Sequence, residues 1–216
     1  MDFKAVLFDL DGTLLDTLAD IAGAVNTALS GLGYPQHPVS AYKYFVGEGI
    51  RVLARQVLPN DKKTPENVAA CLAAISREYA KGLIEKTRPF DGVPGLLQEL
   101  ITKKIKIGIV TNKPQELTNR SIREFFPGIP FNVVIGEEKG RPIKPDPAGP
   151  LMALQAISVK PSECIYVGDS GVDMQTALNT GMFGIGVLWG FRAKEELLTA
   201  GAKKIIAKPG EIGDLF

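Results

Sequence analysis

The chain contains 216 residues, which is enough for one large domain or for a domain with a modest insertion. Its 45% hydrophobic and 23% charged residues are ordinary for a globular protein, and its formal net charge of +1 favours neither nucleic acid nor an anionic membrane as a partner. The composition therefore excludes selection of an anion by overall charge, so any anion-binding groups must be local.

The N-terminal residues, the cysteines and the apolar runs indicate where the protein works. Residues 1–4 lead directly into a strand-like run without the pattern of a secretory signal, and no apolar stretch is long enough to span a membrane. Cys71 and Cys164 stand in apolar surroundings and are too few for a disulfide framework. We therefore expect a soluble, cytoplasmic protein in a reducing compartment, as a monomer or a homodimer.

Short apolar runs bounded by turn residues predict the strands. Their apolar residues are continuous rather than alternating, which is typical of strands covered on both faces in a parallel sheet. Helical patterns such as Val93–Leu100 separate them, so we predict an α/β fold with a doubly wound parallel sheet. In chain order the expected strands are Ala5–Phe8, Ile105–Val110, Asn132–Ile135, Cys164–Val167, Gly184–Leu188 and Lys204–Ala207.

The first expected strand ends in an acidic motif, Asp9-Leu10-Asp11-Gly12-Thr13. Two carboxylates two positions apart at the carboxyl end of a strand can point into the crevice where open α/β sheets bind ligands. A plain turn and a fragment of a calcium-binding loop are the alternatives. The calcium alternative fails because the later ligand positions lack the expected terminal Glu.

The segment from about residue 15 to residue 89 interrupts the alternation of strands and helices, because it contains helical patterns and no convincing strand. Asp20 is the expected N-cap of a helix over Ile21–Leu29. Further helical patterns cover residues 40–46, 49–58 and 65–86. We therefore predict an α/β core made of residues 1–14 and 90–216, with an all-helical module of residues 15–89 inserted into it.

Two later segments carry groups that suit an anion. Thr111 and Asn112 follow the second strand, where a hydroxyl and backbone N–H groups can hold phosphate oxygens, although ordinary capping is the alternative. Lys144 stands in a proline-rich loop, where it could neutralise charge shared by a carboxylate and a phosphate. Most lysines are solvated surface charges instead, so neither segment decides the function alone.

The fourth expected strand is followed by two more acidic residues, Asp169 and Asp173. Four carboxylates that converge without a cation would repel one another strongly. Mg²⁺ prefers hard oxygen ligands, water and a substrate phosphate. Each motif has an ordinary explanation by itself, but their joint occurrence at the strand ends predicts a site for magnesium and phosphate.

These motifs resemble those of the haloacid dehalogenase superfamily, and the resemblance covers essentially the whole chain. The matching positions are Asp9-x-Asp11-Gly12-Thr13, Thr111, Lys144 and Gly168-Asp169-x-x-x-Asp173. The resemblance implies a Rossmann-like core and identifies residues 15–89 as that superfamily's helical cap. The branch with phosphoglycolate phosphatases is most similar, through DLDGTLLDT (9–17), VGEG (46–49), TNKP (111–114), KPDP (144–147) and EELLTAGA (195–202).

The resemblance also implies a role for each matched residue. Asp9 would be the nucleophile that forms an aspartyl phosphate, and Asp11 would serve as acid and then as base. The residues expected to bind the substrate phosphate are Thr13, Thr111, Asn112 and Lys144. The residues expected to hold Mg²⁺ are Asp9, Asp11 through its backbone carbonyl, Asp169 and, nearby, Asp173.

Two further residues are candidates for substrate contacts. Arg51, in the helical module, could pair with a substrate carboxylate, and Lys113 could also reach the substrate. For both, an exposed surface charge is the alternative. The module is expected to close over the site through hinges near residues 15–18 and 87–90 and so to set substrate choice.

The expected activity is that of a Mg²⁺-dependent phosphomonoester hydrolase acting on a small phosphorylated metabolite, with 2-phosphoglycolate favoured. Another capped phosphatase, a pyrophosphatase and a sugar phosphomutase of the same superfamily are the enzymatic alternatives. A catalytically silent binding or regulatory module is the alternative of another class. A closing cap disfavours protein substrates, and the chain lacks the clustered basic face that nucleic acids require.

Overall fold

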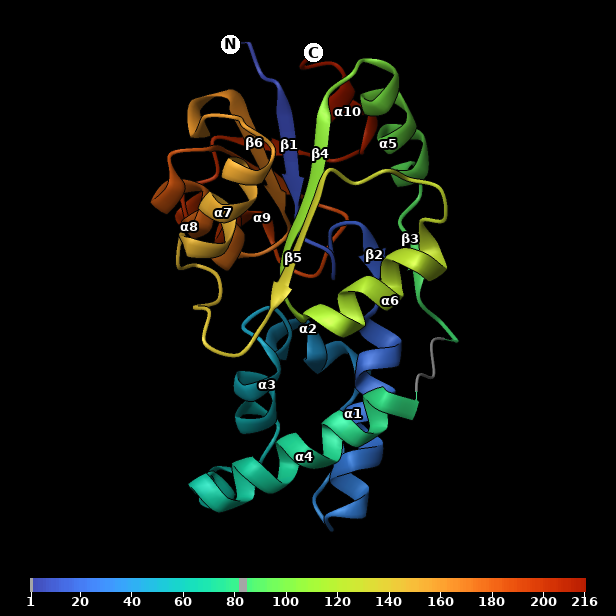
Figure 1. Cartoon of the computed structure of the whole chain (residues 1–216). Helices are drawn as coiled ribbons and strands as arrows, with labels where there is room; N and C mark the ends of the chain where they lie inside the picture. The colour runs from blue at the N-terminus through green and yellow to red at the C-terminus, as the bar shows by residue number, and fades with distance from the viewer. Residues whose placement is uncertain (1, 82–84) are drawn as a thin grey trace. The chain divides into compact units, whose positions relative to one another are not determined.

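The protein is described by a computed structural model that covers residues 2–81 and 85–216. The chain divides into two compact units (Figure 1). The first unit comprises Met1–Asp16 and Pro89–Phe216, and the second comprises Thr17–Arg88. The described helices include none that is both long and apolar enough to cross a membrane.

A six-stranded parallel sheet runs through the first unit in the order β5-β4-β1-β6-β7-β8. Its strands are β1 (Ala5–Phe8), β4 (Lys106–Pro114), β5 (Val133–Glu137), β6 (Cys164–Gly168), β7 (Phe183–Val187) and β8 (Lys204–Ile206). Each strand expected from the sequence is present. β4 alone is much longer than expected, because the polar residues after Val110 stay extended and Pro114 still pairs with Glu137.

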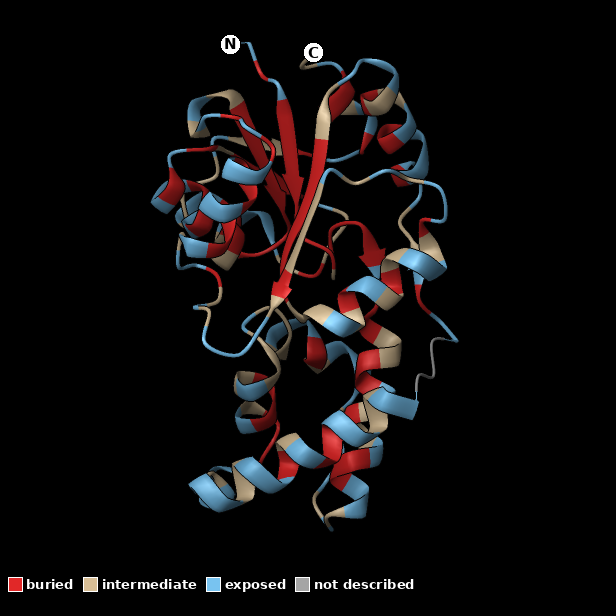
Figure 2. Ribbon diagram, in the orientation of Figure 1, coloured by how far each residue is buried: buried red, intermediate tan, exposed pale blue. Residues whose placement is uncertain are grey.

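Helices cover both faces of this sheet, which confirms the predicted fold class. They are α5 (Val93–Thr102), α6 (Gln115–Phe125), α7 (Ala148–Ala156), α8 (Gly171–Thr180), α9 (Lys194–Thr199) and α10 (Gly210–Gly213), with a short 3₁₀ helix η3 (Pro161–Glu163). Successive residues of β1 point to opposite faces, and both sets are buried (Figure 2). Val6 and Phe8 pack into a core with α5, whereas Ala5 and Leu7 pack into a core with α7. Burial on both faces accounts for the continuous apolar runs of the strands.

The second unit is helical. Its elements are α1 (Leu18–Gly31), η1 (Val39–Ala41), α2 (Tyr42–Phe45), α3 (Ile50–Gln56), η2 (Asn60–Lys62) and α4 (Pro65–Lys81). Val25, Tyr42 and Ile75 are completely buried within it. The Tyr42 hydroxyl donates to Asn26 Oδ1 at 2.7 Å, so the buried phenol keeps a hydrogen-bond partner and the helices can pack around it.

Three details of residues 15–89 differ from the sequence-based expectation. Asp20 was expected to cap α1, but the N-cap position is Thr17. Asp20 lies in the first turn, where its carboxylate accepts hydrogen bonds from the backbone N–H groups of Lys86 and Thr87 and from the Thr87 hydroxyl. This carboxylate therefore stabilises the segment at Lys86 and Thr87 through hydrogen bonds, and it also interacts favourably with the positive end of the α1 dipole.

The predicted helix over residues 65–86 also ends earlier than expected. α4 is described as far as Lys81, residues 82–84 lie outside the described part, and Lys86 stands in a bend. Two strands of two residues each, β2 (Leu15–Asp16) and β3 (Arg88–Pro89), form a second sheet. They were not predicted, because two residues are too few to establish an alternating pattern.

Candidate active site

The site is built where three strands of the first unit end. β1 is hydrogen-bonded to β4 on one side and to β6 on the other. Asp9 directly follows β1, Thr111 and Asn112 lie in the last part of β4, and Asp169 directly follows β6. All four side chains are buried, and they stand at the edge where open α/β sheets bind ligands.

Asp9, Asp169 and Asp173 form a buried acidic cluster. Each offers a carboxylate oxygen, and these oxygens lie within 4.8 Å of one another. The three residues are 6%, 2% and 0% exposed, respectively. Such a group of carboxylates is poorly solvated and self-repelling, so it has a strong requirement for positive charge.

The pKa values reflect this repulsion. Burial raises the pKa of Asp9 to about 6, with Asp173 adding to the rise and Lys144 opposing it. Burial, followed by the charges of Asp173 and Asp9, raises the pKa of Asp169 well above its usual range. In the absence of a further cation, Asp9 and Asp169 therefore tend to retain protons.

Lys144 supplies one positive charge to the cluster. Its Nζ lies 3.0 Å from Asp9 Oδ1 and 2.6 Å from Asp173 Oδ1, and its side chain is only 3% exposed. Burial lowers the pKa of Lys144, but the charges of Asp173 and Asp9 outweigh burial and hold the pKa well above its ordinary value. Lys144 therefore pairs with two of the three carboxylates of the acidic cluster.

The ring of Tyr166 packs against the ammonium group of Lys144. The Nζ of Lys144 lies 5.5 Å from the centroid of the Tyr166 ring, within the range of a cation–π contact. The Tyr166 hydroxyl donates to the Val110 carbonyl at 2.8 Å and thereby ties β6 to β4. Sequence reasoning missed this role, because Tyr166 stands inside an apolar run and its pattern indicates only core packing.

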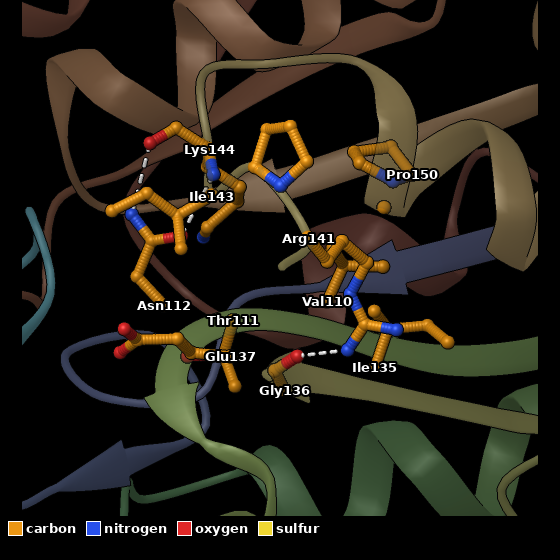
Figure 3. Close-up of a pocket in the computed structure, with 12 residues that line it drawn as sticks. Val110, Thr111, Asn112, Ile135, Gly136, Glu137, Arg141, Ile143, Lys144 and Pro150 are labelled. Carbon is orange, nitrogen blue, oxygen red and sulfur yellow. Dashed lines mark hydrogen bonds between the residues drawn. The ribbon is translucent and has the colours of Figure 1, made fainter. Parts of the chain in front are cut away.

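Asn112 fixes the loop that carries Lys144. Its Nδ2 donates to the Lys144 carbonyl at 3.0 Å, and its Oδ1 accepts from the Lys144 N–H at 2.8 Å (Figure 3). The side-chain amide of Asn112 therefore bonds to the backbone of this loop, and the phosphate-binding role expected of this residue stays a prediction. The Thr111 hydroxyl bonds to Asp9 and lowers the pKa of that carboxyl against the effect of burial.

A small pocket adjoins these residues. It is lined by the ends of β4 and β5 and by the loop that leads to α7, with Thr111, Asn112 and Lys144 on its wall (Figure 3). The Arg141 guanidinium closes another side by donating to the Gly136 carbonyl. Three of the residues expected to bind phosphate, Thr111, Asn112 and Lys144, therefore border a recess in the first unit, whereas Thr13 is not among the residues that line it.

Hydrogen bonds orient the other two carboxylates of the acidic cluster. Asp169 accepts from the Thr13 hydroxyl at 3.2 Å and from the Phe191 N–H at 2.8 Å. Asp173 Oδ2 accepts from the N–H and the hydroxyl of Ser170, at 3.1 and 2.6 Å. Ser170 could have been found in the sequence as a capping residue three positions before an acid, whereas no local pattern points to Phe191.

The remaining predicted residues lie outside the acidic cluster. Asp11 forms an ion pair with Lys113, whose Nζ is 2.8 Å from one carboxylate oxygen and 3.1 Å from the other. Arg51 is exposed on α3 in the second unit and belongs to no part of the cluster. Within the first unit, the structure thus brings together most of the predicted core residues and pairs Lys113 with Asp11.

Comparisons with known proteins agree with this arrangement. The family model of haloacid dehalogenase-like hydrolases matches residues 6–187. The phosphoglycolate phosphatase of Pseudomonas putida is 33% identical over 192 residues, covering 87% of this chain and 70% of that protein. That of Xanthomonas campestris pv. campestris is 32% identical over 211 residues, covering 97% and 94%.

A solved structure is similar over the whole chain. It is the crystal structure of a protein from Lactobacillus delbrueckii subsp. bulgaricus, described as a candidate phosphoglycolate phosphatase. It has a TM-score of 0.93 and 32% sequence identity, and covers 100% of this chain and 98% of that one.

Proposed function

Since this chain belongs to the haloacid dehalogenase-like hydrolases, we propose that it is a Mg²⁺-dependent phosphatase that hydrolyses small phosphate monoesters with Asp9 as nucleophile. The observation that carries the proposal is the buried acidic cluster of Asp9, Asp169 and Asp173, balanced only in part by Lys144. Relatives named phosphoglycolate phosphatase cover most of the chain and support the same activity.

The acidic cluster fits a divalent cation. Lys144 pairs with two of its three carboxylates, and Asp9 Oδ1, which lies 3.0 Å from Lys144 Nζ, is buried without a hydrogen bond to any of the described residues. Asp9, Asp169 and Asp173 would hold Mg²⁺, with the Asp11 carbonyl as a further ligand. When bound, the ion neutralises charge that develops on the phosphoryl oxygens.

The first half of the reaction transfers the phosphoryl group to Asp9. The Asp9 carboxylate attacks phosphorus, the ester P–O bond breaks, and Asp11 gives a proton to the leaving alkoxide. Burial suits Asp9 to this role because little hydration has to be removed before attack. Lys144 and the Thr111 hydroxyl both contact the Asp9 carboxylate and orient it.

The second half releases phosphate. A water oxygen attacks phosphorus, Asp11 takes the proton of that water, and the P–O bond to Asp9 breaks so that the Asp9 carboxylate is regenerated. Uncatalysed monoester hydrolysis needs an acceleration of up to ~10²¹-fold, of which acid–base help supplies only ~10²–10⁴-fold. Positive groups such as Lys144 must therefore supply a large share through electrostatic stabilisation.

The favoured substrate is 2-phosphoglycolate, because relatives named phosphoglycolate phosphatase are 33% and 32% identical to this chain over 192 and 211 residues. In this proposal the helical unit acts as the cap, and Arg51 is a candidate partner for a substrate carboxylate. The two described cysteines are buried and free, which supports a reducing, cytoplasmic location.

A substrate panel tests the proposal. Phosphate release from small monoesters, including 2-phosphoglycolate, is measured with Mg²⁺ and with EDTA for the wild type and for Asp9→Asn. Asp9→Asn should lose activity by roughly 10⁴-fold or more, the scale seen when a member of a catalytic unit is removed. Asp214→Asn, the same substitution at an exposed position of the same unit, should behave like the wild type.

Two results would overturn the proposal. One is the absence of phosphate release from every monoester by the wild type in the presence of Mg²⁺. The other is equal activity of Asp9→Asn and the wild type, which would exclude Asp9 as the nucleophile.

A further inference from the structure

Lys113 occupies a rigid position at the end of β4. Its N–H donates to the Thr111 hydroxyl at 3.3 Å, and its carbonyl accepts from the Thr118 hydroxyl at 3.2 Å. The neighbouring strand packs so closely that a Cβ atom on Gly136 would lie 2.8 Å from the Lys113 carbonyl oxygen. The backbone that carries this lysine is therefore fixed on both sides.

The side chain of Lys113 is directed at Asp11 rather than at solvent. Its Nζ contacts both carboxylate oxygens, at 2.8 and 3.1 Å, and the two side chains are only 15% and 12% exposed. Ion pairs that are shielded from water are less weakened by solvent than surface pairs. Contact with both oxygens also restricts rotation of the carboxylate.

A second lysine of the site, Lys144, pairs with carboxylates other than Asp11. Lys144 pairs with Asp9 and Asp173, so it serves the nucleophile and the acidic cluster. Lys113 is the cation that serves Asp11, the residue to which the proposed function gives the proton transfers. The two lysines thus pair with different carboxylates: Lys144 pairs with Asp9 and Asp173, and Lys113 pairs with Asp11.

We propose that Lys113 is a positioning residue that holds the Asp11 carboxylate for the water-activating step. This inference rests on the proposed function. After Asp11 has given its proton to the leaving group, it is the carboxylate that pairs with Lys113. It then accepts a proton from water as the water oxygen bonds to phosphorus, while the bond from phosphorus to Asp9 breaks.

This role differs from a direct contact between Lys113 and the substrate. A substrate contact would stabilise the bound ester, and its loss would raise KM with little change in kcat. A positioning role in the second half-reaction leaves binding intact, and its loss slows breakdown of the phosphorylated enzyme. The two roles therefore predict different kinetic signatures.

The test follows release of p-nitrophenolate from p-nitrophenyl phosphate by stopped flow in the wild type and in Lys113→Met. Nitrophenolate leaves without help from an acid, so phosphorylation of Asp9 should continue in the variant. We expect a larger initial burst than in the wild type, followed by a steady rate lower by roughly 10²-fold. Phosphorylated enzyme should accumulate in acid-quenched samples.

Variants at the same and at a matched position serve as controls. Lys113→Arg keeps the positive charge and should recover much of the steady rate. Lys203→Met removes an exposed lysine from the same unit and should leave the kinetics unchanged. In an Asp11→Asn background, Lys113→Met should have little further effect, because Lys113 is proposed to act through Asp11.

Several outcomes would overturn the inference. They are a wild-type steady rate in Lys113→Met, a raised KM without accumulation of phosphorylated enzyme, and a full additional loss in the Asp11→Asn background. Circular dichroism checks folding, and Lys113→Gln replaces Lys113→Met if the latter does not fold. Failure of the proposed function itself is recognised separately, because then the wild type would release no nitrophenolate or phosphate.

Discussion

Lys144 balances charge for two carboxylates that lie in different parts of the chain. Its Nζ lies 3.0 Å from Asp9 and 2.6 Å from Asp173, and water is nearly excluded from all three side chains. Burial of an ion pair contributes little net stability by itself, but removal of one partner leaves an uncompensated buried charge. This residue should therefore matter to folding as well as to phosphate binding.

We predict that Lys144→Met lowers the free energy of unfolding of the metal-free protein by about 3–5 kcal/mol, the usual cost of breaking a buried ion pair. Lys4→Met, which removes an exposed partner of Glu163, should leave the free energy of unfolding close to that of the wild type. Urea unfolding in EDTA measures both changes. Addition of Asp173→Asn to Lys144→Met should recover part of the lost free energy of unfolding. Equal decreases in the free energy of unfolding for Lys144→Met and Lys4→Met would contradict the account.

The sequence predicted the charged residues of the site better than the residues that support them. Asp9, Asp169 and Lys144 stand out because carboxylates and a constrained lysine at strand ends have few structural reasons to occur together. The hydrogen bonds of the Asn112 side chain to the backbone of Lys144 were not predicted, and its expected phosphate contact stays a prediction. Tyr166 gave no signal, since a buried aromatic residue in a strand looks the same whether or not a cation lies above its ring.

At the scale of elements, the loop after β7 lies directly against the acidic cluster. Phe191 donates its N–H to Asp169, and the Trp189 indole donates to the Thr13 carbonyl at 2.9 Å. A Cβ atom on Gly190 would lie 2.2 Å from Asp169 Cβ and 2.4 Å from the Gly12 carbonyl oxygen. Only glycine therefore allows this loop to approach the cluster so closely.

We predict that Gly190→Ala weakens activation by Mg²⁺ by about 10- to 100-fold, the range found when groups behind a metal site are disturbed. The reason is that the new methyl group must displace Asp169. Titration of phosphate release with Mg²⁺ measures the effect. Gly95→Ala in α5, where a Cβ atom would meet nothing within 4 Å, is the control and should leave activation by Mg²⁺ unchanged. If Gly190→Ala gave the same Mg²⁺ titration as the wild type, the proposed role of the loop would be excluded.

The elements themselves were predicted to different degrees for physical reasons. Buried parallel strands are recognisable because both faces demand apolar residues, so β1 was predicted with its observed ends. β2 and β3 were missed because pairing of two residues depends on tertiary structure rather than on pattern. Asp20 was misassigned because an acid near a helix start suits both an N-cap and the first turn.

At the scale of the whole molecule, the acidic cluster links stability to metal and pH. Burial raises the pKa of Asp9 to about 6 from an ordinary value of 3.8, and it raises the pKa of Asp169 as well. The folded, metal-free protein therefore holds protons that the unfolded chain would release. Its stability from these groups is full at low pH and falls as pH rises through the folded-state pKa.

We predict that Mg²⁺ stabilises the protein more at about pH 8 than at about pH 5, because the ion must displace those protons at low pH. At a concentration of 100 times Kd the stabilisation should reach about 2.7 kcal/mol. The difference in Tm between Mg²⁺ and EDTA, measured at both pH values, checks this. Asp169→Asn should reduce the difference, and a Tm shift that is equal or larger at low pH would contradict the proposed site.

The division of the chain into a core and an inserted segment was predictable, because it depends only on the order of the strand and helix patterns along the sequence. The interruption of the strand pattern predicted an inserted helical segment over residues 15–89, and the compact unit of Thr17–Arg88 contains the helices α1 to α4. The role of that unit as a cap, its hinges and the contribution of Arg51 stay predictions. They depend on a bound substrate and on movement, which neither pattern nor composition determines.

The central claim is that Asp9 becomes phosphorylated, and the most direct test locates the phosphoryl group. The enzyme is quenched in acid during turnover of its best substrate and reduced with borohydride, which converts an aspartyl phosphate to homoserine. Peptide mass spectrometry then identifies the altered residue. The account predicts homoserine at position 9 in the wild type and in Asp214→Asn; alteration of another residue, or of none while phosphate is still released, would contradict it.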